Sequence, residues 1–416
     1  MPKKSAPLAP AQPLTRRHFL EQLGAIGGSS LVFSAMSSMT LMADNAGDRP
    51  QLSGKPAKAR VLVLGAGVSG LVVGYELSKL GYDFQILEAR DRVGGLNWTV
   101  RRGAEHTEIN GGERQVCNWD EGQYVNVGPW RIPHSHKGVL GYCKEVGVPL
   151  QIFLNESDAQ YLYYEGEQFG DLSGKKLRWR EVKADLQGQI NELFIKAIDQ
   201  HKLDAPLTTE DQERLVRFLV GQGYLDSTDR KYKAFENRGP GDPIALTSLL
   251  RANLGQRMRS IAPLEGTVAL PMFQPIGGMD QFPKGLARAI GASKITLNAE
   301  IQSVHQDDKG VKVVYLNTRT GKKTELLADY VVCCLPLTIV ANLDINLSPE
   351  MMTAVKGVSY SPSAKIGLAM KSRFWEDEDR IFGGHLWTNM PIGELTIRSR
   401  ARAVTSMKRS PAALTT

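Results

Sequence analysis

A glycine-rich segment near the start of the chain has the residue types and spacing needed to bind a dinucleotide. Gly65, Gly67 and Gly70 form the pattern Gly-x-Gly-x-x-Gly directly after the apolar residues 60–64. The first glycine permits a sharp turn, the second lets the backbone approach a pyrophosphate, and the third permits close packing between helix and strand. Glu88 comes 23 residues after Gly65, close to the roughly 20-residue spacing at which a carboxylate binds ribose hydroxyls and repels a 2′-phosphate.

Two strands and a helix must position these residues. The pattern predicts a buried strand, then a helix, then a second strand, over 60–64, 68–80 and 83–87. Val68 and Ser69 stand in the first turn of the helix, where unpaired N–H groups and the positive end of the dipole favour a bound phosphate. Gly81 stands where a helix stop is expected.

The cysteines and histidines give weaker signals. The four cysteines show neither metal-binding nor redox spacing: Cys117, Cys143, Cys333 and Cys334. The last two lie in the apolar run 330–335, which predicts a buried strand and favours a packing role. A bridge between Cys117 and Cys143 stays open. His134 and His136 have no Cys, Asp or Glu cluster nearby, which favours a solvated or helix-start position over a metal site.

Residues 88–95 read Glu-Ala-Arg-Asp-Arg-Val-Gly-Gly and resemble the diglycine stretch of the flavin amine oxidase family. The resemblance implies that the dinucleotide is FAD. It implies cofactor contacts from this part of the chain by Gly65, Gly67, Val68, Ser69, Gly70, Glu88, Ala89, Arg90, Gly94, Gly95 and Leu96. Leu96 is a departure, because the family pattern usually continues with arginine. One cationic contact to the FAD phosphates is therefore not expected from this position.

Further segments resemble the family, and most closely its L-amino-acid oxidases, in the same order along the chain. Residues 124–133 resemble the segment beside the flavin, which implies contacts from Gly128, Pro129, Trp130 and Arg131. Residues 277–283 are similar to the return into the FAD domain. Residues 298–304 are similar to the strand whose aliphatic residue, here Ile301, touches the adenine.

The last matching segment contains a lysine. Ala364, Lys365 and Ile366, followed by Phe374 and Trp375, are similar to the strand that carries the family's flavin-facing lysine. Together the matching segments cover about residues 59–395, and their order is more specific than any one of them.

The resemblance implies an FAD-dependent oxidase that converts L-amino acids and O₂ into keto acids, ammonia and H₂O₂. Arg131 would hold the substrate carboxylate and Lys365 would position a water near the flavin. Alternatives stay open: an oxidase of monoamines or polyamines, in which Arg131 is structural, or a truncated and inactive flavoprotein. An internal salt bridge for Arg131 and an exposed strand position for Lys365 are also open. The stretch 88–95 disfavours a nicotinamide-dependent dehydrogenase.

The fold class expected is α/β, with a Rossmann-like FAD-binding domain and a discontinuous α+β substrate domain that contains a helical insertion. The pattern divides the chain into a signal and linker over 1–45, a first FAD piece over 59–150, a substrate domain with its helical part over 151–270, a return to the FAD domain over 271–345, substrate-domain strands over 346–397 and a basic tail over 398–416.

Finer patterns predict individual elements. They predict a helix over 136–146, a hairpin over 161–169, a loop over 239–243 and a turn over 307–310. Apolar residues at every fourth position predict a long helix through Val182, Leu186, Ile190 and Phe194. Thr208 or Thr209 opens a second helix that contains Leu215, Phe218 and Leu219.

The two ends of the chain carry signals of another kind. Arg16 and Arg17 before a short apolar stretch resemble a twin-arginine export signal, which implies the twin-arginine machinery as a partner and a periplasmic or secreted location. The stretch is too short for a membrane span. After Leu395 the apolar patterning stops. We expect a C-terminal truncation with a disordered tail over 398–416, and a shorter complete family member with a basic tail is the alternative.

Composition adds bounds. The chain has 416 residues, 42% of them hydrophobic, and a net charge of +7. Residues 1–58 hold seven basic and three acidic side chains, and the tail adds five basic ones. The remainder is near neutral, so a nucleic-acid partner is not expected. The expected partners are an amine or amino acid and O₂, and a homodimer is one of the oligomeric states that stay open.

Overall fold

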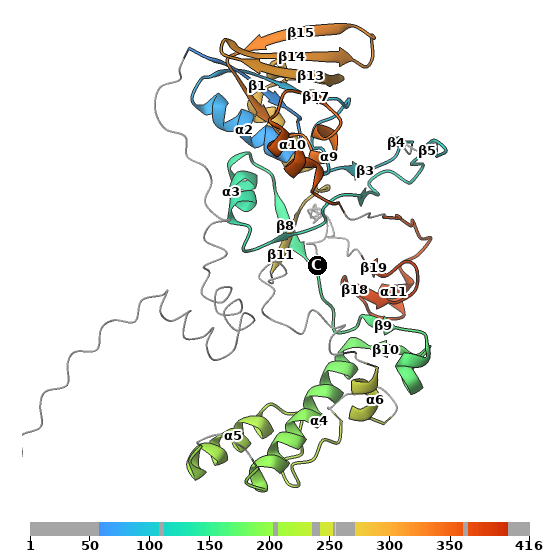
Figure 1. Ribbon diagram of the computed structural model, residues 1–416. Helices are drawn as coiled ribbons and strands as arrows, with labels where there is room; N and C mark the ends of the chain where they lie inside the picture. The colour runs from blue at the N-terminus through green and yellow to red at the C-terminus, as the bar shows by residue number, and fades with distance from the viewer. Residues whose placement is uncertain are drawn as a thin grey trace, which may run out of the picture. The chain divides into compact units, whose positions relative to one another are not determined.

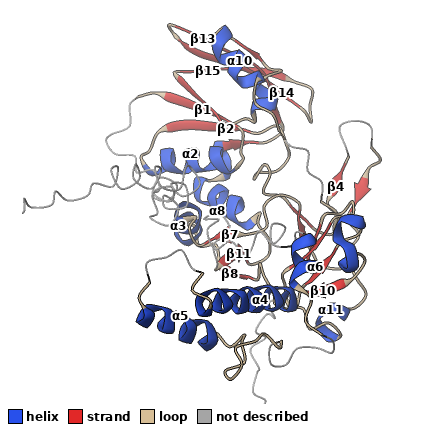
Figure 2. Cartoon of the chain, turned by 60° about the horizontal axis from the view of Figure 1, so that its bottom comes forward, coloured by secondary structure: helices blue, strands red, loops and turns tan. Residues whose placement is uncertain are grey.

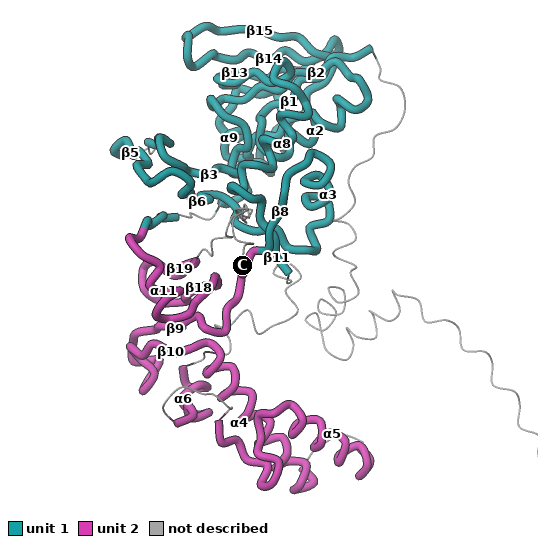
Figure 3. The backbone as a smooth tube through the Cα atoms, turned by 180° about the vertical axis from the view of Figure 1, so that it is seen from behind, with its two compact units in different colours: residues 1–152, 264–369 teal, residues 153–263, 370–416 magenta. Residues whose placement is uncertain are grey.

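The computed structural model describes residues 58–107, 112–202, 207–234, 242–252, 254, 271–360 and 365–397. The predicted signal segment, the basic tail, Ala364 and most of the loop 239–243 lie outside these ranges. The chain divides into two compact units (Figure 3). Unit 1 combines residues 1–152 with 264–369, and unit 2 combines residues 153–263 with 370–416. Residues 346–369 therefore group with unit 1, whereas the sequence pattern placed them among the substrate-domain strands.

A parallel sheet forms the centre of unit 1. Its strands lie in the order β12 (Ile295–Thr296), β2 (Asp83–Leu87), β1 (Arg60–Leu64) and β16 (Tyr330–Cys333). The predicted bounds of β1 and β2 are confirmed. Helix α2 (Val68–Lys79) connects them and lies along one face of the two strands (Figure 2). It ends one residue earlier than predicted, before Gly81 with its φ of +74°.

Apolar side chains from both faces of this sheet form the core of unit 1. One cluster contains Val61, Val63, Leu71, Phe84 and Ile86, which are all buried. It continues onto α8 (Gln281–Ile290) and α3 (Lys137–Glu145), which lies within the predicted range 136–146. The opposite face buries a second cluster that includes Leu62, Leu64 and Leu87. Burial on both faces explains why these strands read as continuous apolar runs.

The prediction of a buried strand over 330–335 is partly wrong. Strand β16 pairs in parallel with β1, but it lies at the edge of the described sheet. Tyr330 is 63% exposed and Cys333 is also exposed. The apolar composition of the run predicted the strand correctly, but it could not show that only one side of the strand has a partner among the described strands.

A second, mostly antiparallel sheet packs on the face of the parallel sheet that carries Leu62, Leu64 and Leu87. Strands β13 (Ala299–Asp307), β14 (Gly310–Asn317) and β15 (Lys323–Ala328) lie side by side (Figure 1), and β17 (Asp344–Ile345) pairs in parallel with β13. The predicted turn over 307–310 is confirmed, because Asp307 pairs with Gly310. This sheet brings Ile301 to the buried cluster that contains Leu62 and Leu64.

Short elements complete unit 1. Strand pairs and a small sheet join β3 (Thr99–Val100) with β6 (Val125–Asn126), β4 (Glu105–His106) with β5 (Gln115–Val116), and β11 (Met272–Pro275) with β7 (Ile132–Pro133) and β8 (Leu150–Phe153). The remaining helices in the described part of unit 1 are η3 (Ala292–Lys294), α9 (Leu337–Val340) and α10 (Pro349–Lys356). Residues 365–370 form no helix or strand, so the strand expected around Lys365 is not found in the described residues.

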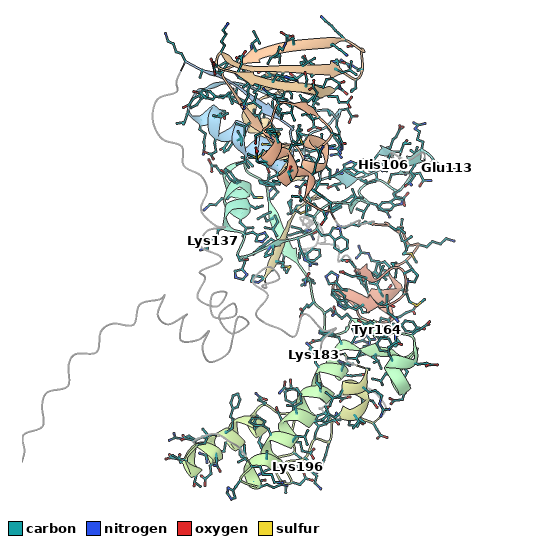
Figure 4. All side chains as sticks on the ribbon, viewed as in Figure 1. His106, Glu113, Lys137, Tyr164, Lys183 and Lys196 are labelled. Atoms are coloured by element: carbon teal, nitrogen blue, oxygen red, sulfur yellow. The ribbon has the colours of Figure 1, made fainter. Side chains whose placement is uncertain are left out.

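Unit 2 is a four-stranded sheet with helices. The strands lie in the order β10 (Lys176–Arg178), β9 (Tyr161–Tyr163), β18 (His385–Thr388) and β19 (Glu394–Thr396). The predicted hairpin over 161–169 is wrong in extent: β9 pairs with β10, and η1 (Glu167–Leu172) lies between them. Tyr164 stacks on Phe169 with ring centroids 5.0 Å apart, and Figure 4 marks Tyr164 beside these strands. Tyr164 and Phe169, which the pattern assigned to strands, therefore pack on each other outside β9 and β10.

Helix α4 (Trp179–Asp199) is the long helix of unit 2, with Lys183 and Lys196 toward its two ends (Figure 4). Val182 is buried, but Ile190 and Phe194 are 40% and 45% exposed. A strict fourfold repeat drifts around a helix of 3.6 residues per turn, so the later members leave the buried face. The other helices found in the described residues of unit 2 are α5 (Thr209–Gly221), opened by Thr208 as its N-cap, α6 (Leu246–Arg251) and α11 (Phe374–Asp377).

Among the helices in the described ranges, none has both the length and the apolar composition required to cross a bilayer.

Candidate functional site

The turn between β1 and α2 is built by two glycines with different packing. Gly65 has a φ of +97°, and its N–H donates to the carbonyl of Leu87 at 2.7 Å, which joins the ends of β1 and β2. A Cβ on Gly70 would lie 1.9 Å from the carbonyl oxygen of Gly65. Helix α2 therefore begins in direct contact with the turn, as the motif predicted.

Gly67 leaves the N-terminus of α2 open. It is the N-cap residue, no side chain caps the helix, and the first turn holds no acidic residue. A Cβ on Gly67 would meet no atom of the described chain within 4 Å. The space beside the Cα of Gly67 is therefore open at the start of α2, where the first N–H groups of the helix and the positive end of its dipole lie. An anion such as a pyrophosphate fits this position.

Glu88 lies at the end of β2, and its side chain is 5% exposed. One carboxylate oxygen accepts from the N–H of Ala66 at 2.8 Å and the other from the N–H of Arg90 at 3.0 Å. These bonds hold the carboxylate beside the glycine turn. Each oxygen keeps a further lone pair, which suits hydroxyl donors such as those of a ribose.

The neighbouring loop joins this site to β13. The N–H of Asn298 donates to the carbonyl of Arg90 at 2.9 Å, and that of Ala299 donates to the carbonyl of Glu88 at 2.8 Å. Ile301 therefore lies two residues beyond a strand end that is bonded to the Glu88 loop. Ala89 and Arg90 are exposed.

The diglycine loop packs on the start of α2. The N–H of Gly94 donates to the carbonyl of Ala66 at 2.8 Å. A Cβ on Gly95 would lie 3.1 Å from the Cα of Gly67. Leu96, which stands where the family pattern has arginine, follows with its side chain 82% exposed. It therefore makes little contact with the described chain.

A buried polar network connects β3 with two distant segments. Thr99 Oγ1 donates to Asn126 Oδ1 at 2.8 Å, and the same Asn126 oxygen accepts from the N–H of Met279 at 3.0 Å. The N–H of Asp280 donates to Thr99 Oγ1 at 3.1 Å. Every bond in this network is buried. The motifs did not single out Thr99 or Asn126, because their role depends on contacts between distant parts of the sequence.

An ion pair extends the network. Two nitrogens of Arg101 donate to the two carboxylate oxygens of Asp280 at 2.7 and 2.8 Å, and Lys284 Nζ donates to Asp280 at 2.6 Å. Burial alone would raise the pKa of Asp280, but the hydrogen bonds from Arg101 and Lys284 outweigh it and lower the pKa. The bond to Asp280 raises the pKa of Arg101. The pair therefore stays ionised at neutral pH.

The segment 128–131 lies beside this network. Trp130 Nε1 donates to the carbonyl of Asn126 at 2.7 Å. A Cβ on Gly128 would lie 1.7 Å from the carbonyl oxygen of Leu96, so a glycine is required there for packing within the chain itself. Pro129 is exposed, and Arg131 is half-buried directly before β7.

Lys365, near the last residues of unit 1 in the sequence, contacts the same segment. Its Nζ donates to the carbonyl of Gly128 and lies 4.1 Å from the centroid of the Trp130 ring. The structure thus brings together Lys365 and the segment that contains Arg131, although 233 residues separate the two in the sequence.

The sequence of the chain matches the flavin-containing amine oxidoreductase family over residues 68–412. The chain belongs to this family. Its cofactor is FAD.

Several curated L-amino-acid oxidases are similar to this flavin amine oxidoreductase. The L-amino-acid oxidase of Pseudechis australis is 28% identical over 346 residues, and L-amino acid oxidase bordonein-L of Crotalus durissus terrificus is 29% identical over 346 residues. The matches cover 80% of this chain and 61% of each of these relatives. BjussuLAAO-I of Bothrops jararacussu is 28% identical, with 64% of its length covered. The chain thus spans less than two thirds of the length of these relatives.

The site fits the FAD of this family. The open N-terminus of α2 suits the pyrophosphate, and the buried carboxylate of Glu88 suits the ribose.

No group of three or more metal-ligating side chains occurs among the described residues. The four cysteines form no disulfide, and burial raises the pKa of Cys143 to about 12, so this thiol stays protonated at neutral pH.

Proposed function

We propose that this flavin amine oxidoreductase is an FAD-dependent oxidase that deaminates L-amino acids to keto acids and releases ammonia and H₂O₂. The observation that carries the proposal is the meeting of Lys365 with the segment 128–131 through Gly128 and Trp130. The similarity to L-amino-acid oxidases supports the choice of an L-amino acid as substrate.

We propose that FAD lies along unit 1. Its pyrophosphate would bind at Gly65, Gly67 and Gly70 with the first-turn residues Val68 and Ser69, and its adenosine would bind at Glu88, Ala89, Arg90 and Ile301. The segments 94–96 and 128–131 would hold the remainder of the cofactor. The support is the hydrogen bonding among these segments, which joins residues 65–66 to 87–88 and 94, and residues 88–90 to 298–299.

The bound flavin would accept a hydride from the substrate Cα and pass the electrons to O₂. Arg131 would hold the substrate carboxylate through two parallel charge-assisted hydrogen bonds, which fixes the position of Cα. Lys365 would position a water near the flavin by a hydrogen bond from Nζ, an ammonium with three donors of which one is directed at Gly128.

A substrate panel tests the proposal. The full chain, loaded with FAD, is assayed for H₂O₂ with L-amino acids, their D-enantiomers and the corresponding decarboxylated amines. The proposal predicts turnover of L-amino acids alone. Turnover of the amines without turnover of the amino acids would show a monoamine or polyamine oxidase, in which Arg131 has a structural role.

We also propose twin-arginine export to the periplasm or the exterior, a property that depends on residues outside the described ranges. The test replaces Arg16 and Arg17 by lysine together and follows the location of the protein after cell fractionation. Retention of the variant in the cytoplasm is the expected result, and unchanged export would contradict the proposal.

A further inference from the structure

Arg92 is a half-buried cation that has no carboxylate partner among the residues the structure describes. Its Nη1 donates to the carbonyl of Gly95 at 3.0 Å, and its guanidinium lies 4.6 Å from the centroid of the Trp98 ring. Within the described ranges, no Asp or Glu lies at ion-pair distance from Arg92. Burial lowers its pKa, and the positive charge of Arg90 lowers it further, against smaller opposing effects from Glu88, Asp91 and Asp280.

Neighbouring arginines of unit 1 differ in this respect. Arg101 has a bidentate partner in Asp280, and the exposed Arg114 pairs with Glu105. Asp280 is fully engaged by Arg101 and Lys284. Partial burial of a guanidinium is costly unless an anion compensates it. The described protein supplies that anion for Arg101 but not for Arg92.

The carbonyl that Arg92 holds belongs to the residue that lies against the open end of α2. Gly95 packs on Gly67, and Gly94 is bonded to Ala66. Arg92 is therefore fixed to the loop that borders the uncapped helix N-terminus. Leu96, at the other end of the diglycine pair, is exposed and uncharged.

We propose that Arg92 is the phosphate-binding cation of the diglycine loop: its guanidinium holds Gly95 through one N–H, and its other donors bind the diphosphate of FAD. A guanidinium has five N–H donors in a planar fork, so both contacts are available to one side chain. This role rests on the proposed position of FAD. It assigns to residue 92 the charge that residue 96 lacks.

The test compares two flavins, one with and one without the diphosphate and the adenosine attached to it. The full chain is stripped of flavin, and the dissociation constants of FAD and of riboflavin, which has no phosphate, are measured by fluorescence at several salt concentrations. Arg92→Ala should raise the constant for FAD by about tenfold or more and leave that for riboflavin nearly unchanged. Its FAD binding should also depend less on salt, because one charge interaction with the phosphates is removed.

Rescue from the neighbouring position makes the test specific. Adding Leu96→Arg to Arg92→Ala should restore FAD affinity, because it returns a cation to the same loop. The same Leu96→Arg change in the unaltered chain should tighten FAD binding much less. Arg102→Ala is the matched control: this exposed arginine bonds the carbonyl of Trp119 and should leave both constants unchanged.

The outcomes separate the inference from the function on which it rests. Equal weakening of FAD and riboflavin by Arg92→Ala, without rescue by Leu96→Arg, would show a structural role and overturn the inference alone. An unaltered chain that binds neither flavin would overturn the cofactor site and the inference together. If Arg92→Ala does not fold, Arg92→Gln with and without Leu96→Arg carries the same comparison, because glutamine removes the charge and keeps an N–H donor for the Gly95 carbonyl.

Discussion

Gly67 and Gly70 belong to one motif, but a side chain would meet different surroundings at each. The Cβ of a residue at position 67 enters open space, whereas one at position 70 overlaps the Gly65 carbonyl. Gly67→Val should therefore leave the unfolding temperature nearly unchanged and abolish FAD binding, measured as flavin absorbance per chain. Gly70→Ala should cost about 3 kcal/mol or more of unfolding free energy. A Gly67→Val protein that retains its flavin would contradict the placement of the pyrophosphate.

The carboxylate of Asp280 predicts a pH dependence of stability. Its pKa lies below the ordinary value of about 3.9. The stabilisation is therefore present above that ordinary value and is lost as pH falls through the lower folded-state pKa. Asp280→Asn should cost about 3 kcal/mol at neutral pH and lose this part of the acid dependence in urea unfolding measured from neutral to acid pH.

A control for Asp280→Asn is available in the same unit. Asp120 pairs with Arg102 at 3.5 Å, and both side chains are exposed. Exposed pairs contribute little to stability, so Asp120→Asn should unfold as the unaltered chain does. Equal effects of the two substitutions would show that the buried network around Asp280 does not brace unit 1.

Kinetics can distinguish the proposed substrate-binding role of Arg131 from a structural role. Arg131→Ala should raise KM for L-amino acids by about tenfold or more, because a charge-assisted contact to the carboxylate is lost. Any slow turnover of a decarboxylated amine should not change. A parallel loss with both substrate classes would indicate a structural role for Arg131. Steady-state H₂O₂ production across the two classes provides the measurement.

Elements with two local signals were predicted best. Strands β1 and β2 combine an apolar run with flanking glycines, and their bounds are as predicted. The prediction failed where the element depends on a partner elsewhere. Strand β16 lies at an edge, β9 pairs across η1 with β10, and no strand forms at 365–370. In each case the side chains are apolar enough for a strand, but strand pairing decides the structure.

Helix α5 allows a test at the level of one element. Thr208 Oγ1 accepts from the N–H of Asp211 at 3.2 Å and caps the helix. Thr208→Ala should remove about 1 kcal/mol from the first turn, which corresponds to about fivefold faster hydrogen exchange of its amides. Thr209→Ala, one residue inside the helix, is the control and should leave the exchange rates unchanged. Unchanged rates in Thr208→Ala would contradict the role of this cap.

In the whole molecule, every residue proposed to bind FAD belongs to unit 1. Unit 1 is assembled from residues on both sides of the segment 153–263. The sequence motifs predicted the members of the site that follow short patterns, such as Gly67 and Glu88. They did not predict Asn126 or Thr99, because three segments far apart in the sequence must meet before those side chains acquire partners.

The most direct measurement is reduction of the bound flavin by substrate in the absence of oxygen. The full chain is purified, its flavin absorbance per polypeptide is recorded, and an L-amino acid or its D-enantiomer is added anaerobically. We expect near-stoichiometric FAD, bleaching of its visible absorbance by the L-amino acid alone, and return of the absorbance when air is admitted. A chain that binds FAD but is bleached by no L-amino acid would contradict the proposed oxidase function.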